Sequence, residues 1–304
     1  MQGILGRMLY RAFASNVQTE IKTTHQPRDP LRFVTGCSGF SKTLSPGPQC
    51  SGLKKLTFGD DSYFIARDKT ADVLGVADGV GGWRNYGIDP SAFSSSLMRV
   101  CEHLVNHGRF KPQSPANLIQ DSYEELLAHK YPLIGGSTAC VVALHKAERT
   151  IYTANLGDSG FMLIRNGEVV HRSEEQQHYF NTPFQLTVAP PEQEGHVLSD
   201  RIEQAAKTSY KVEEGDVLLM GTDGLFDNMH EDMILDYITK YKDRKDAAKE
   251  SACHIAQKAH DLSLDPDYLS PFSMSALNFG IPITGGKPDD ITVLVATVSC
   301  DHGL

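Results

Sequence analysis

Two segments of this 304-residue chain, Leu74-Gly-Val-Ala-Asp78-Gly79 and Leu219-Met-Gly-Thr-Asp223-Gly224, follow the same pattern. Each is a short apolar run that ends in Asp-Gly, and such a run is typical of a buried strand. An aspartate where a strand stops lies at an edge of its sheet, and the neighbouring glycine lets the backbone approach a ligand closely. The two segments therefore predict a β-sheet fold with carboxylates gathered at strand ends.

Aspartates stand next to predicted strands at three further places, Gly59-Asp60-Asp61, Gly157-Asp158 and Asp289-Asp290. One Asp-Gly is a common turn dipeptide and would indicate no function. Carboxylates that converge repel one another unless a cation neutralises them. Mg²⁺ and Mn²⁺ prefer such oxygen ligands. The five places together predict a site for two divalent cations, of the kind that hydrolyses phosphoryl groups.

The order of the predicted elements favours antiparallel sheets flanked by helix pairs over a doubly wound parallel sheet. Asp89-Pro90 and Ser114-Pro115 predict the starts of two paired helices. A second helical pair is expected at Met233–Tyr241 and Ala247–Leu262, and Asn166-Gly167 predicts a hairpin turn. The predicted strands are Ser62–Arg67, Val73–Ala77, Ser137–Leu144, Thr150–Leu156, Gly160–Arg165, Glu168–Arg172, Asp216–Gly221 and Ile291–Val298.

The N-terminal segment differs from the rest in composition. Residues 1–19 contain Arg7 and Arg11, no acidic residue, and apolar side chains at helical spacing, which is typical of a mitochondrial presequence. A soluble N-terminal arm is the alternative. Residues 20–56 carry scattered Gly, Pro and Ser, and we expect them to be loosely structured. The predicted division is a targeting segment and flexible leader at 1–56 and a catalytic domain at 57–304.

Composition excludes several classes of protein. With 29 Lys and Arg against 38 Asp and Glu, the formal charge is −9, so nucleic acid is not expected as a partner. The longest apolar stretch, Ile291–Val298, is too short for a transmembrane segment. The six cysteines lack zinc-ligand spacing, and no phosphate-binding loop, GxSxG or HExxH motif is present. Gly157–Gly160 is similar to a serine-protease nucleophile box, but Phe161 replaces the next glycine and no histidine box precedes it.

From Gly59 onward the chain resembles the metal-dependent type 2C (PPM family) serine/threonine protein phosphatases. The residues that carry the resemblance are Gly59-Asp60-Asp61, Val76-Ala-Asp78-Gly79-Val-Gly-Gly82-Trp83, Asn155-Leu-Gly-Asp158-Ser159, Thr222-Asp223-Gly224-Leu-Phe-Asp227 and Lys287-Pro-Asp289-Asp290-Ile-Thr292. The stretch Gln176–Leu186 is similar to the branch of the mitochondrial PTC-seven homologues. The resemblance implies an αββα sandwich of two antiparallel sheets flanked by helix pairs, in the α+β class.

The resemblance also implies two Mn²⁺ or Mg²⁺ ions per active site. Asp78 matches the bridging ligand, and Gly79 matches the residue that contributes a backbone carbonyl. Asp60 matches a ligand of one ion, while Asp223 and Asp289 match ligands of the other. Asp78 and Asp223 are accordingly the two residues on which catalysis is expected to depend most.

Three more aspartates have less definite roles. Asp61 and Asp158 fall where a supporting carboxylate or a ligand of a third ion is expected. Asp290 directly follows Asp289, so an alignment shift of one residue would exchange their roles.

The chain departs from the family pattern at three places. Val80 stands where many members have a histidine that is proposed to protonate the leaving serine, so His178 or metal-bound water is left for that role. The arginine expected before Asp60 is missing, which leaves Lys54 or Lys55 as phosphate contacts. The segment Asn181–Leu186 replaces an Asp-His-Lys stretch.

The activity implied is hydrolysis of phosphoserine and phosphothreonine in mitochondrial phosphoproteins, by direct attack of a metal-bridging hydroxide and without a phosphoenzyme. We expect a monomer in the mitochondrial matrix. The alternatives are a phosphatase-like scaffold with weak turnover and a phosphohydrolase acting on a small metabolite. The loop from Ser263 to Lys287 is long and contains three prolines, and we expect it to border the active site.

Overall fold

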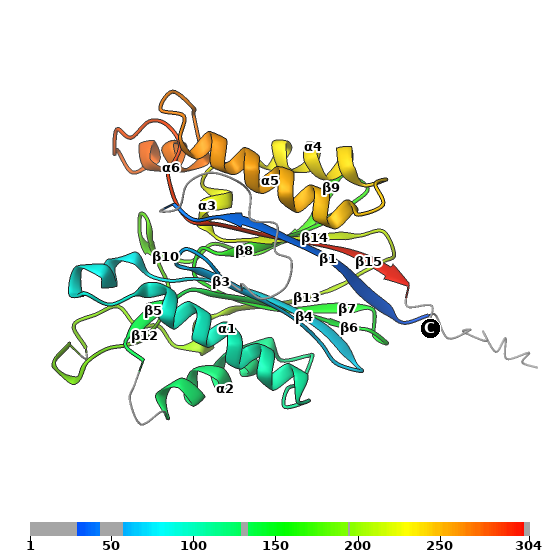
Figure 1. The fold of residues 1–304 in the computed structure, drawn as a ribbon, viewed down its shortest axis with the longest axis horizontal. Helices are drawn as coiled ribbons and strands as arrows, with labels where there is room; N and C mark the ends of the chain where they lie inside the picture. The colour runs from blue at the N-terminus through cyan, green and yellow to red at the C-terminus, as the bar shows by residue number, and fades with distance from the viewer. Residues whose placement is uncertain (1–28, 43–56, 129–132, 194, 301–304) are drawn as a thin grey trace, which may run out of the picture.

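The computed structural model describes residues 29–42, 57–128, 133–193 and 195–300. Two antiparallel sheets pack face to face, and a layer of helices covers each outer face, which confirms the predicted αββα sandwich (Figure 1). The first sheet has five strands, in the order β1 (Leu31–Phe40), β15 (Ile291–Cys300), β14 (Val217–Gly221), β8 (Gly160–Arg165) and β9 (Glu168–Arg172). The second has six, in the order β13 (Ala206–Lys211), β7 (Thr150–Leu156), β6 (Ala139–His145), β4 (Ala71–Asp78), β3 (Asp61–Arg67) and β2 (Thr57–Phe58).

The helices form two layers. Helices α1 (Pro90–Asn106) and α2 (Pro115–Leu127) cover the six-stranded sheet, and α4 (Glu231–Tyr241) and α5 (Ala247–Ser263) cover the five-stranded one (Figure 1). Two short helices lie near strand ends, α3 (Asp223–Phe226) and α6 (Pro271–Asn278). The remaining elements are the strand pairs β5 (Gly135–Ser137) with β12 (Leu186–Val188) and β10 (Gln177–Tyr179) with β11 (Thr182–Pro183), and the 3-10 turns η1 (Gly81–Tyr86), η2 (Pro191–Gln193) and η3 (Ile202–Gln204).

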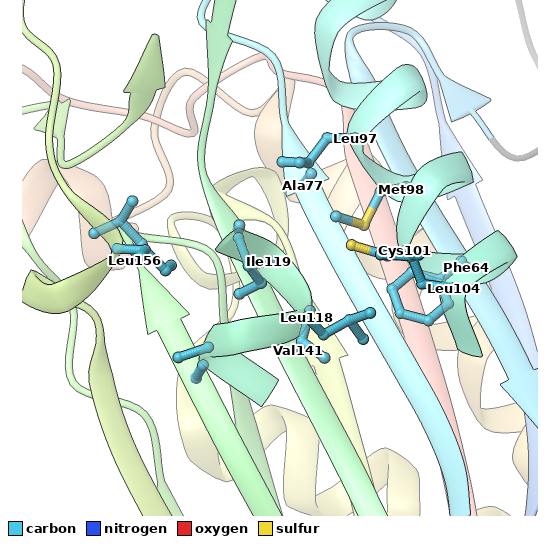
Figure 2. Close-up of a cluster of buried hydrophobic side chains, with 14 of the residues drawn as sticks. Phe64, Ala77, Leu97, Met98, Cys101, Leu104, Leu118, Ile119, Val141 and Leu156 are labelled. Atoms are coloured by element: carbon cyan, nitrogen blue, oxygen red, sulfur yellow. The ribbon is translucent and has the colours of Figure 1, made fainter. Parts of the chain in front are cut away.

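Buried apolar side chains fill three layers, one between the sheets and one under each helix pair. Figure 2 shows the layer under α1 and α2, where Leu97 and Met98 of α1 and Ile119 of α2 pack with Phe64 and Val141 of the sheet. Burial of each such side chain contributes about 1.5–3 kcal/mol. These layers hold the strand ends in fixed positions.

Local sequence signals place several of the elements. The Asp89 carboxylate caps α1 by accepting a hydrogen bond from the Ser91 N–H (3.1 Å), and Pro90 is the first helical residue, as predicted. Helix α2 also begins with its proline, but Ser114 makes no side-chain capping hydrogen bond. Asn166 and Gly167 both have positive φ (53° and 84°) and join β8 to β9, so the hairpin prediction is confirmed.

The expectation that residues 20–56 are loosely structured is wrong for Leu31–Phe40, which form β1. This strand pairs with β15 along its whole length, so the folded domain begins upstream of the boundary predicted at residue 57. Two glycines interrupt the apolar pattern of this strand, so the sequence pattern did not predict it. At Gly36 a Cβ atom would lie 2.4 Å from the Lys249 Cα of α5, so the helix crosses the strand too closely for any side chain.

The predicted targeting segment at residues 1–19 lies outside the described residues, as do residues 43–56. No helix in the described ranges combines the length and hydropathy that a bilayer crossing needs.

Candidate metal centre

The predicted aspartates lie at strand ends from both sheets. Strand β3 begins at Asp61, strand β4 ends at Asp78, and the two residues are opposite each other in the antiparallel pair. In the other sheet, β14 ends immediately before Thr222-Asp223, and Asp289-Asp290 immediately precede β15. The packing of the sheets brings these strand ends together. This is shown by the Thr222 hydroxyl, which donates a hydrogen bond (2.6 Å) to the Asp61 carboxylate of the other sheet.

Three carboxylates form the centre of the cluster. One oxygen from each of Asp78, Asp158 and Asp223 lies within 4.8 Å of the others. The backbone of Asp78 is fixed on both sides by Thr138, whose hydroxyl accepts from the Asp78 N–H (2.9 Å) and whose N–H donates to the Asp78 carbonyl (2.9 Å). The Thr138 hydroxyl in turn bonds to that of Ser159 (2.8 Å). The cluster is therefore positioned by backbone structure and has the oxygen-only chemistry that divalent cations prefer.

Several of the carboxylate oxygens have no hydrogen-bond partner among the residues that the structure describes. They are Oδ2 of Asp60 and the Oδ1 atoms of Asp61, Asp158 and Asp223, all of them buried. A buried carboxylate oxygen without a partner costs free energy, and native proteins rarely keep one without a reason. Bound cations would supply the missing partners. The residues present thus fit a divalent metal centre.

Burial also changes the acidity of the cluster. It raises the pKa of Asp61, Asp78 and Asp158 well above the usual range. The neighbouring charge of Asp223 raises the pKa of all three further. A divalent cation would favour the ionised carboxylates and so oppose both effects.

Asp289 and Asp290 have different surroundings, although they are adjacent. The Asp290 carboxylate is buried and accepts hydrogen bonds from the N–H groups of Lys42 (2.7 Å) and Asp60 (2.8 Å). Asp289 is 19% exposed and lies 3.0 Å from the Lys42 Nζ. Burial alone would raise the pKa of Asp289, but the charges of Lys287 and Lys42 outweigh burial and lower it. Asp290 therefore holds two backbone segments together, and Asp289 presents its carboxylate to charged groups.

Gly79 lies where no side chain fits. A Cβ atom there would be 2.6 Å from the Pro90 carbonyl oxygen, and the Gly79 N–H donates to the Asp60 carbonyl (3.1 Å). This glycine lets the chain pass between Asp60 and helix α1 directly after Asp78. Asp61, by contrast, is anchored through one oxygen, which accepts from the hydroxyls of Thr222 (2.6 Å) and Thr292 (2.8 Å).

Three cations that the sequence reasoning missed contact the carboxylates. The Arg84 guanidinium, from η1, forms an ion pair with Asp60 while remaining 50% exposed. Lys42 lies between Asp60, Asp289 and Asp290, and Lys287 contacts Asp223. Arg84 directly follows the Asp78–Trp83 motif, and Lys287 is the first residue of the Lys-Pro-Asp-Asp motif, so the sequence could have identified both as site residues. No motif contains or adjoins Lys42. Lys54 and Lys55, the predicted phosphate contacts, lie outside the described residues.

His178 is bonded outside the cluster. Its Nε2 lies 2.9 Å from the Asp200 Oδ2, and its ring stacks on Phe184 with centroids 4.3 Å apart. It is not among the residues that line the pocket beside the cluster. The structure thus gives the suggested role of His178 as a proton donor no support.

A pocket of about 180 Å³ opens beside the carboxylates. Asp158, Asp223 and Asp227 form its acidic wall, and Phe180 and Phe272 form part of its apolar wall. Phe272 belongs to α6, within the loop from residue 263 to 287, so the expectation that this loop borders the site is confirmed. The pocket thus offers a small space next to Asp158 and Asp223, two of the predicted site residues.

Comparison with known proteins gives three consistent results. A family profile described as stage II sporulation protein E (SpoIIE) matches residues 70–299. Relatives called "Protein phosphatase PTC7 homolog" are 53% identical in Xenopus laevis, over 97% of this chain and 96% of the relative, and 52% identical in Homo sapiens, with the same coverage. Among solved structures, the photosystem II phosphatase PBCP is 26% identical with a TM-score of 0.71, over 88% of this chain and 98% of that chain. The fold is also that of the PstP serine/threonine phosphatase catalytic domain, solved with two manganese ions (18% identity, TM-score 0.51, 89% and 99% covered).

Proposed function

Because this chain belongs to the PTC7 branch of the metal-dependent type 2C protein phosphatases, we propose that its strand-end aspartates bind two Mn²⁺ or Mg²⁺ ions for the hydrolysis of phosphoserine and phosphothreonine in mitochondrial proteins. The chain is a protein serine/threonine phosphatase, and phosphoproteins are its substrates. We propose, in addition, which residues bind the metal ions, which metal they bind and where in the cell the substrates are.

The proposed ligands are those that the resemblance to the type 2C phosphatases implies, and the cluster of carboxylates supports them. Asp78, which lies close to Asp223 of the other sheet, would be the ligand shared by the two ions, and Gly79 would contribute its backbone carbonyl. Asp60 would bind one ion, and Asp223 and Asp289 would bind the other. The observation that carries this assignment is the approach of Asp78 and Asp223, together with buried oxygens at Asp60 and Asp223 that accept no hydrogen bond from any described residue.

Other aspartates support these ligands or extend the site. Asp61 and Asp290 are anchored by two hydrogen bonds each and fix the backbone of the ligand-bearing segments. Asp158 adds a carboxylate oxygen to those of Asp78 and Asp223, and we assign it the role of a supporting carboxylate. When bound, the cations would lower the pKa of a water molecule and neutralise charge on the phosphoryl oxygens.

Arg84 is proposed to hold the substrate phosphate. Its guanidinium is half exposed at the edge of the cluster and is paired with Asp60, a carboxylate that a cation would neutralise. A guanidinium freed from that pair presents two parallel N–H groups to a phosphate. Arg84 would thus take the part of the arginine that is missing upstream of Asp60.

A mitochondrial location is supported by the basic, acid-free composition of residues 1–19, and the substrates would then be phosphoproteins of the matrix. A monomer remains our expectation.

The test is phosphate release by the purified full-length chain, with EDTA, Mn²⁺ or Mg²⁺, from phosphopeptides and from small phosphorylated metabolites. We expect activity on phosphopeptides that requires a divalent cation. Asp78→Asn and Asp223→Asn should each lower kcat/KM by about 10³-fold, since metal ligation supplies several kcal/mol of transition-state stabilisation. Asp236→Asn, an exposed position on α4, is the matched control and should keep full activity.

Folded Asp78→Asn protein with wild-type activity would refute the ligand assignment. Preferred turnover of metabolites would refute the substrate assignment, and so would negligible turnover of both.

A further inference from the structure

The Lys287 ammonium group is held by three acceptors inside the cluster. Its Nζ donates to Asp223 Oδ2 (2.5 Å), to Asp227 Oδ2 (2.7 Å) and to Asn181 Oδ1 (2.9 Å). An ammonium has three N–H donors, so its hydrogen-bonding capacity is filled. Only 14% of the side chain is exposed. A lysine buried in this way is part of the site and not a mobile surface group.

The backbone of Lys287 is fixed as firmly as its side chain. The buried amide of Asn228 accepts from the Lys287 N–H (2.8 Å) and donates to the Lys287 carbonyl (2.9 Å). Nζ also lies 5.2 Å from the centroid of the Phe272 ring, within the range of a cation–π contact. The position of the ammonium is therefore set by α3, α6 and the segment before β15 together.

The two carboxylates that Lys287 joins would repel each other without it. Asp223 and Asp227 are one helical turn apart, and the Asp227 N–H donates to the Asp223 carbonyl (2.7 Å). Like charges at this spacing are destabilising, and here both are largely buried. Asp158 lies within reach of the same Asp223, and Glu175 lines the same pocket. This side of the cluster thus needs a cation of its own.

We propose that Lys287 is that cation and that its charge neutralises the Asp223–Asp227 pair. Without Lys287, the chain would require a divalent ion at this pair in addition to the two ions of the proposed site. The inference rests on the proposed function, because it takes Asp223 as a metal ligand. It makes Lys287 a positioning residue. With Oδ2 held by Lys287, Asp223 offers its unpartnered Oδ1 to the metal site.

The experiment counts Mn²⁺ ions bound to the full-length wild-type chain and to Lys287→Met, by equilibrium dialysis. The wild type should bind two ions, and Lys287→Met should bind a third with millimolar affinity. In EDTA the melting temperature of Lys287→Met should be lower by about 5–10 °C, because a buried pair has lost one partner. Millimolar Mn²⁺ should restore it. Lys207→Met, at an exposed lysine of β13, is the matched control and should behave as the wild type.

The double variant Lys287→Met/Asp227→Asn separates charge from packing. It removes one charge of each sign, so it should bind two ions and regain most of the lost thermal stability. An unchanged count of two ions in Lys287→Met would overturn the proposal. So would a double variant as unstable as Lys287→Met, including the case in which neither folds. A wild type that binds no divalent cation would instead overturn the proposed function, so the two failures are distinguishable.

Discussion

Asp61 and Asp78 form a cross-strand pair where β3 begins and β4 ends, and the pKa of Asp78 is raised by burial first and then by the charges of Asp223 and Asp61. Like charges directly opposite each other destabilise a sheet. Asp61 is buried and Asp78 is half-buried, and further aspartates lie close to both. In the metal-free protein, repulsion between these carboxylates therefore lowers stability, and bound cations would relieve it. The effect on stability can be measured.

The first prediction concerns the stability of the metal-free protein against pH. Burial, and then the charge of Asp223, raise the pKa of Asp158 above its unfolded value of about 4. The stabilising effect of protonating Asp158 is therefore fully present below about pH 4 and is lost as the pH rises through the folded-state pKa. At pH 8 in EDTA, Asp158→Asn should melt a few degrees above the wild type, and this difference should shrink as the pH falls.

The measurement is thermal unfolding in EDTA between pH 5.5 and 8, with Asp236→Asn as the control at an exposed position. Comparing each variant with the wild type at the same pH cancels the titration of unrelated groups. An Asp158→Asn protein that is less stable than the wild type at pH 8 would contradict the prediction.

The second prediction concerns Arg84. Arg84→Gln should lower kcat/KM by about 10–100-fold, which corresponds to the loss of a charge-assisted contact of 1.5–3 kcal/mol. Inhibition by inorganic phosphate should weaken as well, and the Mn²⁺ concentration for half-maximal activity should not rise. Arg84→Lys should recover part of the activity, because lysine keeps the charge without the planar fork. Unchanged inhibition by phosphate in Arg84→Gln would exclude Arg84 from phosphate binding.

The third prediction separates Asp289 from Asp290. Asp289→Asn should raise the Mn²⁺ requirement with little change in unfolding free energy. Asp290→Asn should cost about 1–3 kcal/mol of stability, because an amide NH₂ would then face one of the two backbone N–H donors from Lys42 and Asp60. Chemical denaturation and Mn²⁺ titration of both variants are the measurements. If the two variants exchanged these effects, the ligand role would belong to Asp290.

The layer order of this fold could be predicted because its elements carry local signals. The cap at Asp89 and the turn at Asn166-Gly167 act over a few residues, and the strands are marked by apolar runs. Strand β1 could not be predicted in this way. Gly36 and Gly39 interrupt its apolar pattern, and both are required by contacts with segments far along the chain, at Lys249 and Ile291.

The candidate site, too, could be predicted from the sequence only in part. Aspartates beside glycines at strand ends could be identified from sequence, because strand ends in packed sheets converge. Lys42 could not be identified in this way, since it is far from Asp289 in the sequence and is brought to it by the pairing of β1 with β15, whereas Arg84 and Lys287 stand beside the acidic motifs. The distinct roles of Asp289 and Asp290 depend on that pairing as well.

The pairing of β1 with β15 also fixes the order of events during synthesis. The first strand that the structure describes, β1, can bond to β15 only after residues 291–300 have been made, and β15 is an inner strand of its sheet. Contacts so distant in sequence form late. Asp289 and Asp290 directly precede β15, so a nascent chain that still lacks them has neither a closed five-stranded sheet nor a complete set of carboxylates. Its hydrolytic capacity would therefore depend on synthesis of the segment from Asp289 to the end of β15.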